Sequence, residues 1–270
     1  MQLAERAWRI REKIIQMIGA AGSGHPGGSL SAAEIVTALY FQIMKHDPQN
    51  PEWPERDRFI LCKGHAAPVL YAALAEAGYF DPAELNSLRK FGSILQGHPD
   101  RKRTPGVEVS TGSLGQGLSI ANGLAIAAKL NGEKHRIFAL LGDGEIQEGQ
   151  VWEAAMTAVH RGLDNLVAYV DNNNLQIDGD VRDVKSLTNI ADRWAAFGWH
   201  VQEIDGHDLG AILAATEKAL AVQGKPSVIV CRTVKGKGVD FMEDQAGWHG
   251  KAPNPEELAN ALTQLQRRGK

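Results

Sequence analysis

The sequence predicts an α/β fold, in which a doubly wound parallel sheet is flanked by helices on both faces. From residue 113 onward, apolar strand-like segments alternate with helical ones at the spacing typical of a parallel sheet. The chain has 270 residues, of which 43% are hydrophobic and 23% charged, as in an ordinary globular protein. Because it contains no internal repeat or low-complexity linker, we expect residues 1–270 to form one domain with an N-terminal helical extension.

The first half of the chain is predicted to be mainly helical. Apolar residues at helical spacing predict an amphipathic helix over 3–18, and the glycine-rich loop GAAGSGHPGG follows at 19–28. Ser31 followed by Glu34 has the pattern of a capping box, so we expect a helix to open at Ser31. The remaining predicted segments are a three-proline turn at 48–58, a strand at 59–62, a helix at 67–77 and a helix that starts at Asp81-Pro82.

The second half alternates regularly between the two kinds of segment. The predicted helices are 114–130, 149–161, 188–197 and 208–222. The predicted strands are 136–141, 165–171, 199–204 and 227–233. The polar tail 253–270 is expected to be a surface helix.

Two of these helices carry apolar residues on almost every side, LSIANGLAIAAKL at 118–130 and VWEAAMTAV at 151–159. A helix that is apolar all round must be covered all round, and a sheet covers only one side of it. A partner subunit is the simplest cover, and a second layer within the chain is the alternative.

Composition excludes several classes of function. The net charge is −3, so the chain has no nucleic-acid-binding footprint. We find neither a signal peptide nor an apolar span of 18 residues, and therefore expect no membrane association and a cytoplasmic location. Cys62 and Cys231 each end an apolar run and are expected to be buried, unreactive thiols.

Polar residues gather where two successive strands end. LLGDGEIQEG places Asp143 directly after the strand at 136–141, and the strand at 165–171 is followed by Asn172, Asn173 and Asn174. Asp143 and Asn173 are separated by about the length of one βαβ unit, so in parallel neighbouring strands they emerge at the same edge of the sheet. A carboxylate and an amide oxygen suit Mg²⁺, especially Mg²⁺ that arrives with a diphosphate. A plain glycine turn is the alternative, and Glu145 is expected only to favour the dipole of the following helix.

Three histidines occur in similar loops. His25, His65 and His98 each follow a glycine and precede a proline or alanine, outside any predicted helix or strand. Imidazole can donate a hydrogen bond to phosphate and exchange protons near neutral pH, so a shared pocket is expected to surround them. The five histidines expected to be structural are His46, His135, His160, His200 and His207.

The motifs together resemble the N-terminal part of transketolase. They are SGHPGG, KGHA, GHPD, TGSLGQG, GDGEIQEGQVWEAA and WHG, which occur in this order without large gaps over nearly the whole chain. The resemblance implies the thiamine diphosphate-binding fold, specifically its diphosphate-binding domain, with thiamine diphosphate and Mg²⁺ as cofactors.

The resemblance also implies roles for individual residues. The metal ligands would be Asp143, Asn173 and the backbone carbonyl of Leu175. The catalytic residues would be His25, His65, His98 and His249. The cofactor contacts would be His65, Gly112, Leu114, Gly142, Asp143, Gly144, Glu148, Asn173, Leu175, Ile177 and His249. Glu148 and Glu153 resemble the acids that meet a partner's glutamate at the subunit interface.

The resemblance further implies a partner. In this family a pyrimidine-binding domain completes the site, and the chain ends before one. We therefore expect a two-gene transketolase whose C-terminal subunit carries that domain, assembled as an α2β2 heterotetramer and acting on sugar phosphates. It would move a two-carbon ketol unit from a ketose phosphate to an aldose phosphate. The alternatives are a related synthase, a 2-oxo acid dehydrogenase subunit, a non-catalytic regulatory paralogue and, more weakly, a generic Mg²⁺-nucleotide binder.

One segment departs from this pattern. VKGKGVDF at 234–241 is more similar to deoxyxylulose-phosphate synthase than to single-chain transketolases. Lys235 and Lys237 in this glycine loop either contact phosphate or belong to a solvated loop.

Overall fold

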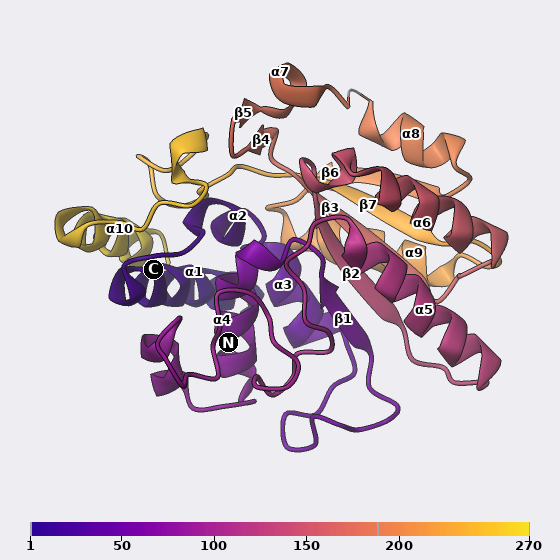
Figure 1. Ribbon diagram of the computed structural model, residues 1–270, viewed down its shortest axis with the longest axis horizontal. Coiled ribbons are helices and arrows are strands. Elements are labelled where there is room, and N and C mark those ends of the chain that lie inside the picture. Colours follow the sequence, from indigo (N-terminus) through magenta and orange to yellow (C-terminus); the bar gives the residue numbers. More distant parts are fainter. Residues whose placement is uncertain (1, 188, 270) are drawn as a thin grey trace.

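A five-stranded parallel sheet forms the centre of the computed structural model, which describes residues 2–187 and 189–269 (Figure 1). Its strand order is β1-β2-β3-β7-β6, and all four pairings are parallel. The strands are β1 (Arg58–Leu61), β2 (Ile137–Gly142), β3 (Leu166–Asn172), β6 (His200–Asp205) and β7 (Ser227–Arg232). A small antiparallel ribbon of β4 (Leu175–Gln176) and β5 (Gly179–Asp180) follows β3. The predicted fold class is confirmed.

The central strands are buried on both faces, because their side chains alternate between two separate cores. In β2, Phe138 and Leu140 join one apolar cluster, whereas Ile137, Ala139 and Leu141 join the other. Successive side chains of a strand point to opposite faces, so an apolar run of this kind can serve both layers of helices.

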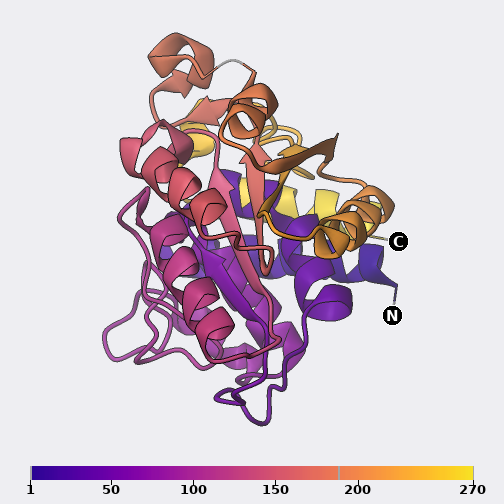
Figure 2. The same cartoon turned by 90° about the vertical axis from the view of Figure 1, so that its right-hand side faces the viewer.

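Helices cover the two faces of the sheet (Figure 2). One layer contains α1 (Leu3–Ala21), α2 (Pro26–Ser31), α3 (Ala33–Ala38), α4 (Ala67–Ala77) and α9 (Leu209–Ala221), with α10 (Pro255–Arg268) packed on α1. The opposite layer contains α5 (Gln116–Leu130), α6 (Gly149–His160) and α8 (Ile190–Ala196). The short elements are η1 (Leu39–Ile43), η2 (Gly64–Ala66), η3 (Pro82–Ser87), η4 (Glu145–Gln147), α7 (Val181–Lys185) and η5 (Ala246–Trp248).

One predicted helix start is wrong, and one predicted helix is of a different type. No capping box forms at Ser31 and Glu34, because Ser31 ends α2 and its hydroxyl donates to the carboxylate of Asp171, while Glu34 pairs with Arg11. The segment after Asp81 is a short 3-10 helix, although Asp81 does cap it by accepting from the backbone of Ala83. Thr188, where the third helix of the second half was predicted to start, lies outside the described residues.

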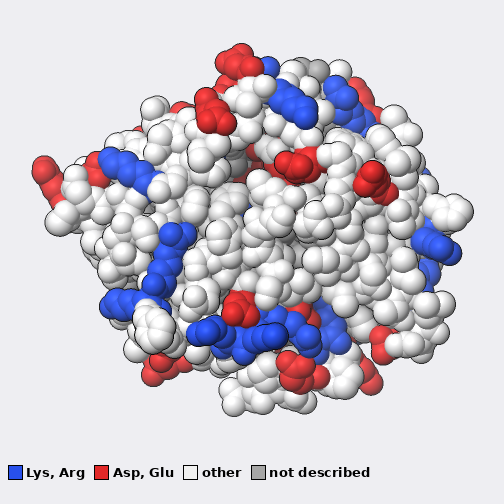
Figure 3. All heavy atoms as spheres, viewed as in Figure 1, with Lys and Arg blue, Asp and Glu red and all other residues white. Residues whose placement is uncertain are grey.

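The outer surface of α5 and α6 is largely uncharged, as the space-filling view shows (Figure 3). Leu130 and Met156 are 82% and 54% exposed there. Among the described residues, no helix combines the length and apolar character needed to cross a bilayer.

Candidate active site

The tips of β2 and β3 bring Asp143 and Asn173 to one edge of the sheet. Gly142 pairs with Asp171 in register, and the next amide, that of Asp143, donates to the Asp171 carbonyl at 3.3 Å. The Asp143 carboxylate accepts from the backbone amides of Gly144, at 2.8 Å, and Asn174. The two strand ends are therefore joined as the sequence predicted, and their role as metal ligands stays a prediction.

A cavity of about 480 Å³ opens at this edge. Most of the proposed site residues line it, namely His65, Leu114, Gly142, Asp143, Gly144, Glu148, Asn173, Leu175, Ile177 and His249. Three others lie beside it. His25 and His98 belong to the adjoining histidine cluster, and a Cβ on Gly112, whose φ is +151°, would lie 3.0 Å from the His98 ring. Glu153 is exposed on α6, away from the cavity lining.

Asp143 has the environment of a carboxylate that needs a cation. It is 2% exposed, and burial, together with the charge of Asp171, raises its pKa to about 7. Among the described residues it forms no ion pair within 4.0 Å. A divalent ion at this carboxylate would favour its charged form, so the residue fits Mg²⁺.

The remaining donors also fit a magnesium ion held together with a diphosphate. No cluster of three or more His, Cys, Asp or Glu residues suited to a metal occurs in the described chain. An ion here would instead use the Asn173 amide oxygen, which accepts from Leu175 N at 3.1 Å, and the Leu175 carbonyl. That carbonyl already accepts from Lys235 Nζ at 2.9 Å, which leaves its second lone pair free.

Four histidines meet at the cavity. The ring centroids of His65 and His249 are 5.0 Å apart, and those of His25 lie 5.3 Å from His65 and 5.6 Å from His249. His98 is 6.5 Å from His25. These residues come from four separate segments of the chain, so the structure assembles the cluster that the Gly-His repeats and WHG suggested.

Burial keeps the four rings neutral. It lowers the pKa of His65 to about 2, of His249 to about 3 and of His25 to about 4, and it also lowers the pKa of His98. Nearby cations add to the effect, with Lys63 next in importance at His65 and Lys235 at His249. A neutral imidazole can accept as well as donate a hydrogen bond, which suits sugar hydroxyls and proton transfer.

The two lysines of the glycine loop, Lys235 and Lys237, have different environments. Lys235 is 2% exposed, lines the cavity and contacts His249 Nδ1 at 2.9 Å. Burial lowers its pKa to about 8. Lys237 does not line the cavity and instead pairs with Glu243 at 3.7 Å. Of these two lysines, Lys235 is the one placed to meet a phosphate in this cavity.

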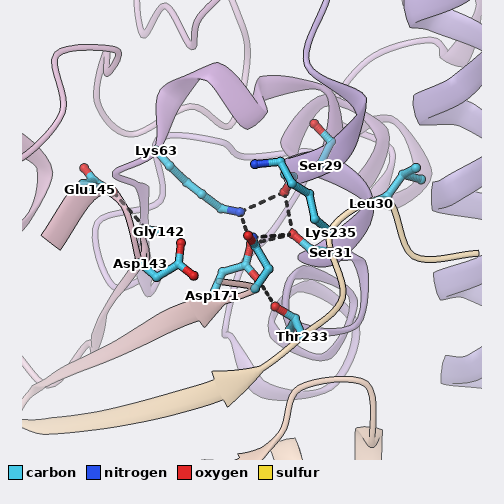
Figure 4. A network of polar contacts seen from close by, with 12 residues as sticks. Ser29, Leu30, Ser31, Lys63, Gly142, Asp143, Glu145, Asp171, Thr233 and Lys235 are labelled. Atoms are coloured by element: carbon cyan, nitrogen blue, oxygen red, sulfur yellow. Dashed lines mark hydrogen bonds and ion pairs between the residues drawn. The ribbon is translucent and has the colours of Figure 1, made fainter. Parts of the chain in front are cut away.

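A buried polar network underlies the site (Figure 4). At its centre, the fully buried carboxylate of Asp171 accepts from Lys63 Nζ, Thr233 Oγ1 and, at 2.5 Å, Ser31 Oγ. Burial alone would raise the pKa of Asp171, but the neighbouring Lys63 and these hydrogen bonds lower it. The sequence indicated no role for Lys63 or Asp171, although Lys63 begins the KGHA motif and Asp171 directly precedes the three asparagines at 172–174.

Glu145 has a different role from the one predicted. It is 3% exposed, and its carboxylate accepts from the backbone amides of Gly115 and Gly142, both at 3.1 Å. Burial raises its pKa to about 7. Glu145 therefore ties the start of α5 to the end of β2, and the helix-dipole interpretation is wrong.

Arg89 is a further cation that the sequence did not reveal. Its backbone has a φ of +62°, which is unusual for a residue with a side chain. The guanidinium reaches Ser23 Oγ at 3.4 Å and His25 Nδ1 at 3.5 Å. It therefore lies beside the histidine cluster.

Comparisons with known proteins agree with this geometry. The family "Transketolase, thiamine diphosphate binding domain" matches residues 4–267. A 6-deoxy-6-sulfo-D-fructose transketolase subunit from Clostridium sp. (strain MSTE9) is 47% identical, with 100% of this chain and 98% of the relative covered. An apulose-4-phosphate transketolase subunit from Phocaeicola vulgatus is 42% identical, with 96% and 92% covered.

Solved transketolases share the fold. The enzyme from Leishmania mexicana superposes with a TM-score of 0.93 at 34% identity over 98% of this chain, and that from Campylobacter jejuni with 0.93 at 37% over 98%. This chain spans only 41% and 43% of those two chains, whereas it spans nearly all of the subunit relatives. The chain therefore belongs to the transketolase family, as a member that carries its thiamine diphosphate-binding domain.

Proposed function

We propose that this chain is the diphosphate-binding subunit of a two-chain, cytoplasmic transketolase that uses thiamine diphosphate and Mg²⁺. It would transfer a two-carbon ketol unit from a ketose phosphate to an aldose phosphate. The observation that carries the proposal is that Asp143 and Asn173 follow adjacent strand tips and line one cavity, which the histidine cluster borders.

The residues of this chain have distinct tasks in the proposal. Asp143, Asn173 and the Leu175 carbonyl would hold the metal, and Lys235 would neutralise part of the diphosphate charge. Gly144 suits this crowded turn, because an added Cβ would lie 3.1 Å from the Cβ of Gln176, closer than an ordinary contact. When bound, thiamine diphosphate supplies the nucleophilic carbon and stores the electrons of the transferred unit.

The histidines would act on the sugar. Because they are neutral, His25 and His98 can donate to or accept from sugar hydroxyls, and His65 with His249 would border the cofactor. Protons can pass between His25 and His249, whose ring centroids are 5.6 Å apart, over a short path. The depressed pKa values favour release of any proton that a ring accepts.

A partner subunit is part of the proposal. The relatives that this chain matches along nearly their whole length are named as subunits. The uncharged outer side of α5 and α6 offers a surface for that partner, which we infer carries the pyrimidine-binding domain in an α2β2 assembly. Glu148, exposed beside the cavity at the start of α6, lies where such a partner would meet the cofactor.

The names of the same relatives support a proposal for the substrate class. One is named for a sulfonated ketose and the other for a ketose phosphate. We therefore place the donor among ketoses with an anionic end, and a phosphate is the group that we favour.

The proposal is tested by copurifying the chain with the protein encoded beside it and measuring ketol transfer. Xylulose 5-phosphate, apulose 4-phosphate and 6-deoxy-6-sulfofructose serve as alternative donors, with pyruvate as a fourth arm. We expect transfer from one of the three sugars that depends on Mg²⁺ and thiamine diphosphate. Consumption of pyruvate alone would instead indicate a synthase or dehydrogenase, and no cofactor binding would indicate a regulatory paralogue.

A further inference from the structure

The side-chain amide of Asn173 is held in one orientation. Its Nδ2 donates to Asp171 Oδ2 at 3.2 Å and approaches Ser31 Oγ at 3.5 Å. Its Oδ1 accepts from the backbone amide of Leu175 at 3.1 Å. Asn173 is 6% exposed, so water cannot readily replace these contacts.

Asp171 determines which way the amide faces. An ionised carboxylate only accepts hydrogen bonds, so the NH2 group of Asn173 must point toward it and the oxygen must point away. Lys63 is the ion-pair partner of Asp171, and Ser31 and Thr233 donate to its carboxylate as well, so both of its oxygens act as acceptors. Its charge is thus satisfied within the protein, unlike that of Asp143.

Lys63 connects this network to the cavity wall. Besides Asp171, its Nζ donates to the carbonyl of Gly28 at 2.8 Å, and both Lys63 and Gly28 line the cavity. The network thereby joins α2, the end of β1, β3 and the end of β7 beneath the site, as Figure 4 shows for Ser31, Lys63, Asp171 and Thr233.

We propose that Asp171 and Lys63 form a positioning pair that fixes the Asn173 amide with its oxygen available to the metal. The pair itself does not bind the ion. This inference rests on the proposed function, because it assigns the pair a task at the proposed metal site. Partners of this kind set the orientation of metal ligands in many proteins, and their loss typically weakens metal affinity roughly 10- to 100-fold.

Substituting Asp171→Asn tests the orientation directly. An amide at position 171 can donate as well as accept, so it no longer requires the NH2 group of Asn173 to face it. Among the described residues, only the backbone amide of Leu175 then favours the native orientation, and the Asn173 amide can turn by about 180° at the cost of that one hydrogen bond. The exchange D171N/N173D should reverse the defect, because a carboxylate at position 173 has two equivalent oxygens and no wrong orientation. The exchange also leaves the net charge near Lys63 unchanged, because one carboxylate is removed and one is added.

The measurement is binding of Mn²⁺, which accepts the same oxygen ligands as Mg²⁺. Free Mn²⁺ is followed by electron paramagnetic resonance in the complex of this chain with its partner subunit, with thiamine diphosphate present. We expect D171N to weaken Mn²⁺ affinity roughly 10- to 100-fold and the exchange to recover most of that loss. Ile212→Val, a buried substitution in α9, is the control for loss of stability alone.

Each outcome has one meaning. Wild-type affinity in D171N would overturn the inference, as would a defect that the exchange does not reverse, since that result indicates a purely structural role. If the wild-type complex itself bound neither Mn²⁺ nor thiamine diphosphate, the proposed function would fail instead. Should D171N not fold because Lys63 loses its partner, K63M/D171N removes both buried charges, and the same prediction of weakened Mn²⁺ binding applies to it.

Discussion

Helices α4 and α5 are similarly apolar, yet they differ in how much of their surface the chain buries. Nine of the 11 residues of α4 are buried, because α1, α2, α3 and η3 surround it, whereas six of the 15 residues of α5 are buried. The only charged residues are Glu76 in α4 and Lys129 in α5. A sequence therefore shows that a helix needs cover on all sides, but not whether its own chain supplies that cover.

The difference has a functional consequence. On the α4 side, the chain's own helices cover the sheet, and we call this the closed side. His25 directly precedes α2 and His65 lies in η2, directly before α4, so both are anchored to this layer. The described part of the chain does not cover the outer surface of α5 and α6, and we call this surface the open side. It borders the cavity through Leu114 and Glu148. A partner that covers the open side therefore also reaches the cofactor site.

The largest expected effect comes from placing a charge on each helix. Ala72→Glu in α4 buries an unpaired carboxylate at a fully enclosed position and should cost more than about 4 kcal/mol, enough to unfold the chain. Ala127→Glu, at an exposed position of α5, should change the stability of the isolated chain by less than about 0.5 kcal/mol but prevent assembly with the partner.

Urea denaturation and size-exclusion chromatography measure the two effects separately. Stable assembly of the Ala127→Glu variant would contradict the assignment of the open side to the partner. A well-folded Ala72→Glu variant would show that α4 is less enclosed than the structure indicates.

Asp143→Ala separates the cofactor site from the docking surface. Activity should fall to background, because a proposed metal ligand is lost, while assembly should match that of the wild type. The fold should be retained, because a buried carboxylate whose pKa is raised to about 7 contributes little to the stability of the metal-free chain. Melting temperatures with and without Mg²⁺ and thiamine diphosphate report the outcome, and undiminished stabilisation by these ligands would defeat the site assignment.

Much of this arrangement was predictable from the sequence. The apolar runs located the strands, and βαβ spacing placed Asp143 and Asn173 at one edge of the sheet. Family resemblance supplied proposed roles such as that of Leu175, which would act through its backbone and has no signature in its side chain.

Other features were beyond a sequence-based argument. Ser31 and Glu34 match a capping box, but their distant partners, Asp171 and Arg11, determine their contacts. The buried pair of Lys63 and Asp171 likewise has no periodic signal, because it joins two strands far apart in the chain. Contacts of this kind depend on topology, which local patterns do not encode.

Acid should loosen the closed side first. Burial would raise the pKa of Glu34, but the adjacent Arg11 and a hydrogen bond from His207 lower it from 4.5 to about 2. The ionised group therefore stabilises the fold above pH 4.5, and this contribution, about 3 kcal/mol, is lost as the pH falls from 4.5 toward 2.

Hydrogen exchange resolved by segment measures this loss. Protection in α1 and α3 should fall across that range, and Glu34→Gln should flatten the dependence of stability on pH. Equal loss of protection in α5 and α6 over the same range would contradict a local origin at Glu34.

The smallest expected effect concerns Gly123, which lies exposed in the middle of α5. A Cβ at this position would have nothing within 4 Å, so the chain itself gives no reason for a glycine that costs helix stability. Gly123→Ala should therefore stabilise the isolated chain by about 0.5–1 kcal/mol in urea denaturation. If the partner's backbone approaches α5 closely here, the same methyl group should weaken the complex, measured by calorimetric titration of the two subunits. A more stable chain with weaker subunit affinity would indicate that the partner contacts α5 at Gly123. An increase in both stability and affinity would indicate that the partner binds another part of the open side.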